Sequence, residues 1–261
     1  FHKTFRRAEK TVRPIMEAVR KFGDRAVFRY TKQFDRAALK TLRVSEKEFE
    51  SAARQVKTAD RLTLQAVVDR FRRFYAAQKL RGAPFVDATG FYSERISPLD
   101  RAGLYVPGGR APLVSPLLML AVPAEVAGVH ERLVATPPRP DGSVPPIILE
   151  AARAAGVTAV FKMGGAQALA AFAYGTRQVP AVDKIFGPGN VFVTAAKKIL
   201  FGDVGIDMLA GPSELVVIAD ETAPAPLVAE DLLAQAEHGA DSLAILLTTS
   251  PAVAASVKTE I

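Results

Sequence analysis

Four successive segments of the chain share one pattern: a short apolar run, a turn rich in Gly or Pro, and then a helix rich in Ala and Leu. The strand-like runs cover 102–106, 132–136, 157–163 and 183–186, and the helices that follow lie near 115–128, 144–155, 166–175 and 193–200. Strands that alternate with helices in this way favour a parallel sheet covered by helices. The pattern therefore predicts an α/β fold.

The sequence on either side of these units differs. Residues 1–80 are expected to be mostly helical, with Ser45 as the N-cap of a helix that has an acidic first turn. Residues 23–35 are aromatic and β-branched, which predicts a strand or a loop, and 81–100 is irregular. Two further strands, 214–219 and 242–248, bracket a helix over 225–236. This last unit could belong to another sheet, because 202–212 intervenes.

Composition excludes several classes of protein. The chain has 261 residues, 49% of them hydrophobic and 23% charged, which is typical of a globular protein. It contains no cysteine, so disulfides, a thiol nucleophile and cysteine-based zinc sites are excluded. No apolar run is long enough to span a membrane. We expect no membrane association and a cytoplasmic location.

The net charge of +7 is concentrated in the first hundred residues, which hold 23 Lys and Arg against 12 Asp and Glu. A basic region of this kind can bind nucleic acid. Here the basic residues are scattered along amphipathic helices such as 59–79, as on a solvated helix face. We therefore expect no nucleic-acid partner.

Three of the glycine-rich turns follow strands of the predicted sheet: Pro107-Gly108-Gly109, Gly164-Gly165 and Gly187-Pro188-Gly189-Asn190. Ligands of open parallel sheets bind at the carboxyl ends of the strands, and glycine lets the backbone approach them closely. For any single turn, a tight strand-to-helix connection without a ligand is the favoured interpretation. Three at one edge favour an anionic ligand such as a pyrophosphate. The dinucleotide fingerprint G-x-G-x-x-G is absent, so the turns do not by themselves identify the ligand.

Gln235 and His238 are three residues apart, and a helix would place both side chains on one face, where they could hold a metal ion. On the residues alone an ordinary helix face is the favoured interpretation, because Gln is a weak metal ligand. Ser213 precedes a strand and could either bind a polar substrate or shape a turn. His130 is expected at the surface, and no G-x-S-x-G motif indicates a hydrolase.

Five of these segments together resemble the histidinol dehydrogenase family. They occur in the family's order and with similar spacing, at 103–109 (GLYVPGG), 164–168 (GGAQA), 183–190 (DKIFGPGN), 206–214 (IDMLAGPSE) and 235–239 (QAEHG). The region 45–80, which ends in AQKL, is also similar. The resemblance therefore covers essentially the whole chain.

The resemblance implies an enzyme that uses zinc and two NAD+ to oxidise L-histidinol through the aldehyde to L-histidine, the last step of histidine biosynthesis. By position, Tyr105, Gln167 and Asn190 match the family's NAD contacts. The substrate contacts match Ser213, Gln235 and His238. Gln235 and His238 also match two of the four zinc ligands, which makes a neutral amide ligand acceptable.

The family fold implies two incomplete Rossmann-like parallel-sheet domains and a helical N-terminal region. We expect 1–100 to form the helical region and the first part of domain 1, 101–210 to form an inserted domain 2 on the NAD side, and 211–261 to return to domain 1 with the zinc and substrate helix. The resemblance also implies an intertwined homodimer.

The family's catalytic Glu-His pair and its remaining zinc ligands would lie beyond Ile261. We therefore assign no catalytic residue within 1–261 and expect this segment alone to be inactive. Two alternatives stay open: a related zinc- and NAD-dependent enzyme acting on another small alcohol, or a non-catalytic NAD-binding module.

Overall fold

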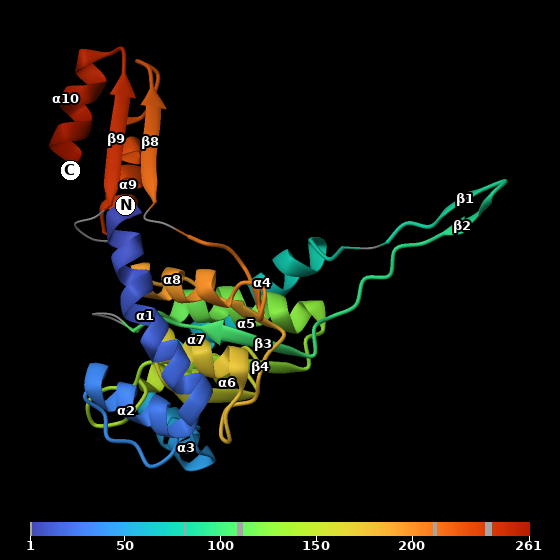
Figure 1. The fold of residues 1–261 in the computed structure, drawn as a ribbon. Coiled ribbons are helices and arrows are strands. Elements are labelled where there is room, and N and C mark those ends of the chain that lie inside the picture. Colours follow the sequence, from blue (N-terminus) through green and yellow to red (C-terminus); the bar gives the residue numbers. More distant parts are fainter. Residues whose placement is uncertain (1, 81, 109–111, 211–212, 238–241) are drawn as a thin grey trace. The chain divides into compact units, whose positions relative to one another are not determined.

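The computed structural model of the chain describes residues 2–80, 82–108, 112–210, 213–237 and 242–261. The chain divides into two compact units, Phe1–Leu209 and Ala210–Ile261, which are described separately (Figure 1). The predicted assignment of 1–100 and 211–261 to one domain concerns the whole protein and stays a prediction. None of the described helices is long and apolar enough to cross a membrane.

A five-stranded parallel sheet forms the centre of the first unit (Figure 1). Its strands stand in the order β5-β4-β3-β6-β7. Their bounds are β3 Arg101–Tyr105, β4 Glu131–Thr136, β5 Ala159–Lys162, β6 Lys184–Phe186 and β7 Gly205–Ile206. The first four were predicted, whereas β7 was not, because it is only two residues long and lies in the expected break over 202–212. The chain thus builds outward from β3 to β5 and then resumes on the other side of β3.

Helices join these strands and cover both faces of the sheet. They are α5 Val114–Ala127, α6 Pro146–Ala154, α7 Gly165–Tyr174 and α8 Val191–Leu200. Side chains alternate along the strands: Val134 packs in a core with α5 and α6, and its neighbours Leu133 and Ala135 pack in a second core with α7 and α8. Right-handed crossovers running in opposite directions from β3 place the two helix pairs on opposite faces. The predicted Rossmann-like α/β class is confirmed.

Four N-terminal helices form an outer layer on this core. Their bounds are α1 His2–Phe22, α2 Asp24–Phe34, α3 Glu46–Gln55 and α4 Thr58–Ala77. Helix α1 packs on α7 and α8, α2 packs on α7, α3 on α6, and α4 on α5. The predicted N-cap is confirmed: the Ser45 hydroxyl accepts from the Glu48 N–H, and the Glu48 carboxylate accepts from the Ser45 N–H at 2.8 Å.

Two predictions for the N-terminal region were wrong. Residues 23–35, expected as a strand or loop, form α2, because Ala26, Val27 and Thr31 recur at helical spacing and are buried on the side of α2 that packs on α7. The irregular stretch 81–100 contains an antiparallel hairpin of β1 Phe85–Asp87 and β2 Gly90–Tyr92.

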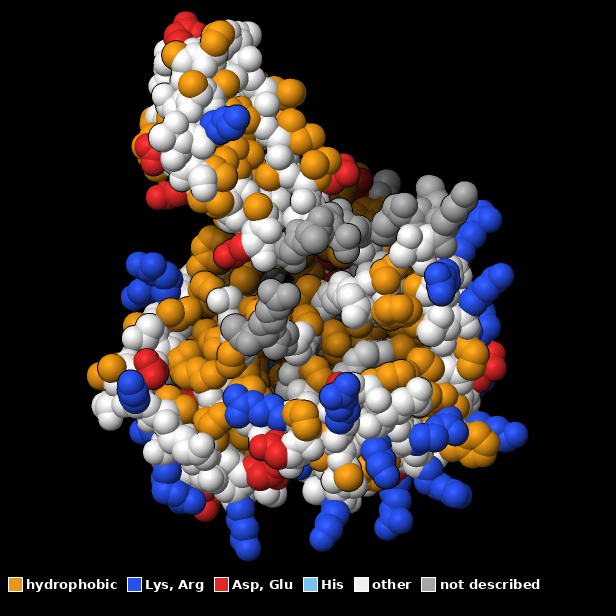
Figure 2. Space-filling view, turned by 90° about the vertical axis from the view of Figure 1, so that its left-hand side faces the viewer, with side chains coloured by type: hydrophobic (Ala, Val, Ile, Leu, Met, Phe, Trp, Pro, Cys, Tyr) orange, Lys and Arg blue, Asp and Glu red, His pale blue; other side chains and the backbone are white. Residues whose placement is uncertain are grey.

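On the face seen in Figure 2, Lys and Arg side chains of the first unit stand apart around its edge, and they form no continuous patch there.

The second unit is a separate β-α-β-α arrangement. Strands β8 Glu214–Ala219 and β9 Leu243–Thr248 pair in parallel, and they are followed by α9 Ala225–Ala236 and α10 Pro251–Glu260. Both helices pack on one side of the strands, around Val228, Leu232 and Val257. The prediction that this unit forms another sheet is confirmed.

The reversal of strand order brings the ends of β3 and β6 together. Gly187, directly after β6, has φ +126°, and a Cβ built on it would lie 2.1 Å from the Tyr105 carbonyl oxygen at the end of β3. The backbone at Gly187 and the backbone at Tyr105 lie so close together that no side chain fits between them. Only glycine fits this position without displacing the turn.

We predict that Gly187→Ala lowers the free energy of unfolding by about 4 kcal/mol, because the methyl group adds a backbone overlap to the strain of positive φ. Gly202→Ala is the matched control, since Gly202 has φ +105° and nothing within 4 Å of the built Cβ. It should cost only about 1–2 kcal/mol of strain. Urea unfolding measures both, and equal losses would show that the contact with Tyr105 is not tight.

Candidate functional site

The candidate site lies at the carboxyl edge of the five-stranded sheet, where the strand order reverses between β3 and β6. Ligands of doubly wound sheets bind at this position. The turns after β3, β4 and β5 are packed together: a Cβ on Gly108 would lie 2.6 Å from the Pro137 side chain, and one on Gly164 would lie 2.7 Å from it. The glycines therefore let three connections converge on one proline and form a continuous edge.

Tyr105 ends β3 and points its ring into the core shared with α7. It is only 4% exposed, and its hydroxyl accepts a hydrogen bond from the Gly165 N–H at 3.1 Å. Burial raises the pKa of this phenol, and the nearby Asp35 carboxylate raises it further. The tyrosine thus stays neutral and holds the first turn of α7 against the end of β3.

Gln167 lies in the first turn of α7 and is 1% exposed. Its Oε1 is buried and has no hydrogen-bond partner in the described part of the chain. A buried amide oxygen without a partner costs roughly 1–3 kcal/mol. An oxygen in this state at a ligand edge is suited to receive a donor from a bound molecule or from water.

Asn190 is the N-cap of α8: its Oδ1 accepts from the backbone N–H groups of Phe192 at 3.1 Å and Val193 at 3.2 Å. It is exposed at the edge, so its amide nitrogen remains available. The structure places Tyr105, Gln167 and Asn190 on turns of the same sheet edge. Their predicted role in binding NAD stays a prediction.

An ion pair between the buried Lys197 and the partly exposed Asp207 fixes the turn after β6, and the sequence analysis missed it. Lys197 on α8 is 3% exposed, and its Nζ lies 2.5 Å from both the Gly187 carbonyl and Asp207 Oδ1. The second oxygen of Asp207 accepts from the Gly187 N–H at 2.8 Å. Both backbone groups of Gly187 are thereby held. The signal in the sequence was a lysine at the seventh position of a largely apolar helix.

Asp35, at the C-cap of α2, was also missed. Its Oδ2 is buried without a hydrogen-bond partner among the described residues. Burial raises the pKa of this carboxyl from 3.8 to about 6. The group is half-buried, and no Lys or Arg in the described ranges forms an ion pair with it.

In the second unit the structure brings two predicted substrate contacts together. Gln235, in the last turn of α9, donates from Nε2 to the backbone carbonyl of Ser213 at 3.1 Å. This bond leaves Oε1 of the amide as the free end. Since an amide can ligate a metal only through its oxygen, the orientation fits a metal ligand.

The predicted partner of Gln235, His238, lies outside the described residues. Helix α9 ends at Ala236, and Glu237 is its C-cap. The predicted shared helix face of Gln235 and His238 is therefore not tested. Within the parts of the chain that the structure describes, no three His, Cys, Asp or Glu side chains are grouped closely enough to hold a metal.

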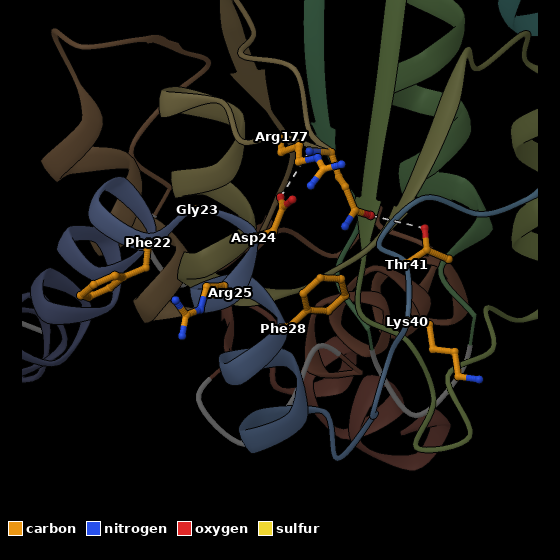
Figure 3. A pocket seen from close by; sticks show the side chains of 9 residues that line it. Phe22, Gly23, Asp24, Arg25, Phe28, Lys40, Thr41 and Arg177 are labelled. Atoms are coloured by element: carbon orange, nitrogen blue, oxygen red, sulfur yellow. Dashed lines mark hydrogen bonds between the residues drawn. The ribbon is translucent and has the colours of Figure 1, made fainter.

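A cavity of about 740 Å³ lies elsewhere in the first unit, between α2, the segment after it and the turn that follows α7 (Figure 3). Arg25, Lys40 and Arg177 lie around it, and the Asp24 carboxylate accepts from the Gln178 N–H at 3.3 Å. None of the predicted site residues lines this cavity. The candidate site is therefore the glycine-rich sheet edge and not this cavity.

The parallel sheet with helices on both faces and the reversal of strand order between β3 and β6 define a doubly wound, Rossmann-like α/β protein. The sequence profile described as "Histidinol dehydrogenase" matches residues 2–261. The chain therefore belongs to the histidinol dehydrogenase family.

Relatives and a solved structure agree with this assignment. The chain is 46% identical over 254 residues to histidinol dehydrogenase of Halalkalibacterium halodurans, covering 97% of this chain and 60% of that protein. It is 51% identical over 245 residues to that of Symbiobacterium thermophilum, covering 93% and 56%. The crystal structure of histidinol dehydrogenase from Elizabethkingia anophelis superposes with a TM-score of 0.91 at 41% identity, covering 96% of this chain and 58% of that chain. The chain thus spans somewhat less than two thirds of these proteins.

We predict that Asp207→Ala lowers the free energy of unfolding by about 2–3 kcal/mol, because the buried Lys197 ammonium loses its carboxylate partner and keeps only the Gly187 carbonyl. The control is Glu9→Ala, which breaks the ion pair of Glu9 with the half-exposed Lys198 on the same helix. That change should cost less than about 1 kcal/mol. Chemical denaturation of both variants is the measurement, and similar losses would contradict the role of Asp207.

We predict that Asp35→Asn stabilises the protein at pH 7.5 and has no effect near pH 3. The wild-type carboxyl is protonated in both states at low pH; as pH rises from about 4 to 6 the unfolded state ionises first, so stability is lost. Two pKa units set a ceiling of about 3 kcal/mol, which solvent screening of this half-buried group reduces to about 1 kcal/mol. Melting temperatures across this pH range test the sign, and a variant less stable at pH 7.5 would refute it.

Proposed function

We propose that the whole protein oxidises L-histidinol to L-histidine through L-histidinal, with two NAD+ as hydride acceptors, as the last step of histidine biosynthesis. The observation that carries the proposal is the family match over 2–261, joined to an unpartnered Gln167 oxygen at the edge where doubly wound sheets bind ligands. The chemistry is assigned to the whole protein and not to this segment alone.

NAD would bind at the carboxyl edge of the first unit. Tyr105 and Gly165 hold the β3 and β5 turns together, and Gln167 Oε1 offers an acceptor to a donor group of the cofactor. Asn190 caps the start of α8 with its amide oxygen, and its exposed amide nitrogen can donate to the cofactor at this edge. The Lys197–Asp207 pair keeps the turn before α8 in place, so the site is formed before the cofactor arrives.

Zinc would be held by Gln235 and His238 together with ligands outside this chain, and Ser213, Gln235 and His238 would contact the substrate. The bond from Gln235 Nε2 to the Ser213 carbonyl supports the assignment, since it directs the amide oxygen away as the ligand atom. When bound, zinc supplies a Lewis acid that polarises the alcohol oxygen of the substrate. The roles of this chain's residues are to hold the ion and orient the alcohol.

The same proposal includes the assembly and its location. We propose a homodimer in the cytoplasm, with L-histidinol as the small-molecule substrate and no nucleic-acid or membrane partner. This chain spans 56–60% of the length of the first two relatives, so the chemistry is proposed for the whole protein. Residues 211–261 are proposed to complete a domain begun by 1–100.

Turnover of the whole protein tests the proposal directly. We expect NADH to form with L-histidinol, about two per substrate, and to stop when a chelator removes zinc. No turnover in the presence of added zinc would refute the proposal. Turnover of another small alcohol without turnover of L-histidinol would instead favour a related alcohol dehydrogenase.

We also predict that His238→Ala in the whole protein loses bound zinc and turnover together, by at least about tenfold in each, because a zinc site does not tolerate loss of one of four ligands. His130→Ala is the matched control, since His130 is an exposed histidine of the first unit, directly before β4, and is none of the predicted ligands. Elemental analysis gives the zinc content. Wild-type zinc occupancy in His238→Ala would contradict the assignment.

A further inference from the structure

Asp35 is placed at the candidate site by two features of the local backbone. Its N–H bonds to the Thr31 carbonyl at 2.9 Å and closes α2, and Arg36 then takes φ +59° and turns the chain away. Helix α2 packs on α7, the helix that begins at the glycine-rich turn after β5. Asp35 is thereby near enough to Tyr105 for its charge to act on the phenol.

Three oxygens on these two helices are buried without hydrogen-bond partners in the described ranges. They are Asp35 Oδ2, Thr31 Oγ1 and Gln167 Oε1. Thr31 and Asp35 are four residues apart on α2 and share one face. No hydrogen bond or ion pair with another described residue reaches the Asp35 carboxylate, which can only accept when it is ionised. Further hydrogen-bond donors for this group would come from a bound molecule, from water or from residues outside the described ranges.

The chemistry of these oxygens indicates which donors suit them. In doubly wound proteins that bind a dinucleotide, a carboxylate at the end of the second strand holds ribose hydroxyls. In this chain the second strand, β4, ends in Thr136-Pro137-Pro138, which carries no carboxylate. Asp35 offers a carboxylate beside the same sheet edge, from a helix outside the sheet. A pair of neighbouring hydroxyls would supply the donors that its oxygens lack.

We propose that Asp35 is a further cofactor-binding residue, whose carboxylate accepts hydrogen bonds from ribose hydroxyls of the NAD bound at this edge. This inference rests on the proposed function, because it needs NAD at the site. Asp35 is a binding residue in this account and takes no part in hydride transfer. The competing explanation is that water alone satisfies these oxygens.

Calorimetric titration of the whole protein at pH 7.5 tests the inference, with NAD+ and with analogues that each lack one ribose hydroxyl. Asp35→Asn keeps the shape of the side chain and removes its charge. We expect it to weaken NAD+ binding about tenfold to a hundredfold, the effect of losing charged hydrogen bonds. At least one deoxy analogue should bind wild type and Asp35→Asn equally, because its bond to Asp35 is already missing.

Asp24→Asn is the matched control, since Asp24 begins the same helix and its carboxylate already accepts from the Gln178 N–H. It should bind NAD+ as wild type does, and a melting temperature of Asp35→Asn at or above that of wild type shows that the variant is folded. Unchanged NAD+ affinity in Asp35→Asn, or an equal loss for NAD+ and every analogue, overturns the inference. A wild-type protein that binds no NAD+ overturns the proposed function itself, which separates the two failures.

Discussion

The close passage of two backbone segments at the reversal of strand order is the constraint on which the rest of the structure depends. Gly187 passes the end of β3 so closely that its missing side chain would overlap the Tyr105 carbonyl. The Lys197–Asp207 pair then holds both backbone groups of this glycine. Because of this arrangement β6 can lie beside β3, and the helices that follow cover the opposite face of the sheet. The candidate site is the edge that results.

The edge combines firmly bonded groups with groups that have no partner. Tyr105 binds the start of α7 and Asn190 caps α8, so both turns are fixed. Gln167 and Asp35 keep buried oxygens without partners in the described part of the chain. A buried oxygen without a hydrogen bond lowers the stability of the folded protein, and a bound molecule that donates to it removes this cost. A preformed edge with unpaired acceptors therefore suits a ligand that carries hydroxyl and amide donors, as NAD does.

Much of the fold could be predicted from the sequence, because strands buried on both faces and Ala/Leu-rich helices give strong local patterns. The four main strands, their helices and the separate β8–α9–β9 unit were all expected. Helix α2 was not, because its aromatic and β-branched residues suggest a strand and only its packing on α7 shows which face is buried. The two-residue strand β7 has no local signal and exists because its backbone pairs with β6.

The sequence predicted the site residues that carry a local signal and missed those that matter because of their packing. Glycine-rich turns and the family motifs indicated Tyr105, Gln167 and Asn190, whereas Asp35 and Lys197 were missed because their importance comes from burial. A carboxylate at the end of a helix is usually solvated, and a lysine in a helix is usually exposed. Only three-dimensional packing reveals that Lys197 is buried and that one carboxylate oxygen of Asp35 is shielded from water. Ser213 and Gln235 were expected to be close, and the bond between them adds an orientation that no sequence pattern shows.

Hydrogen–deuterium exchange of the whole protein, with and without NAD+, tests most directly the claim that the cofactor binds where the strand order reverses. The account predicts slower exchange on NAD+ binding in the turns 164–167 and 187–193 and at the end of α2, with little change in the hairpin of β1 and β2. Protection confined to other segments, such as the cavity beside Arg25 and Arg177, would contradict it.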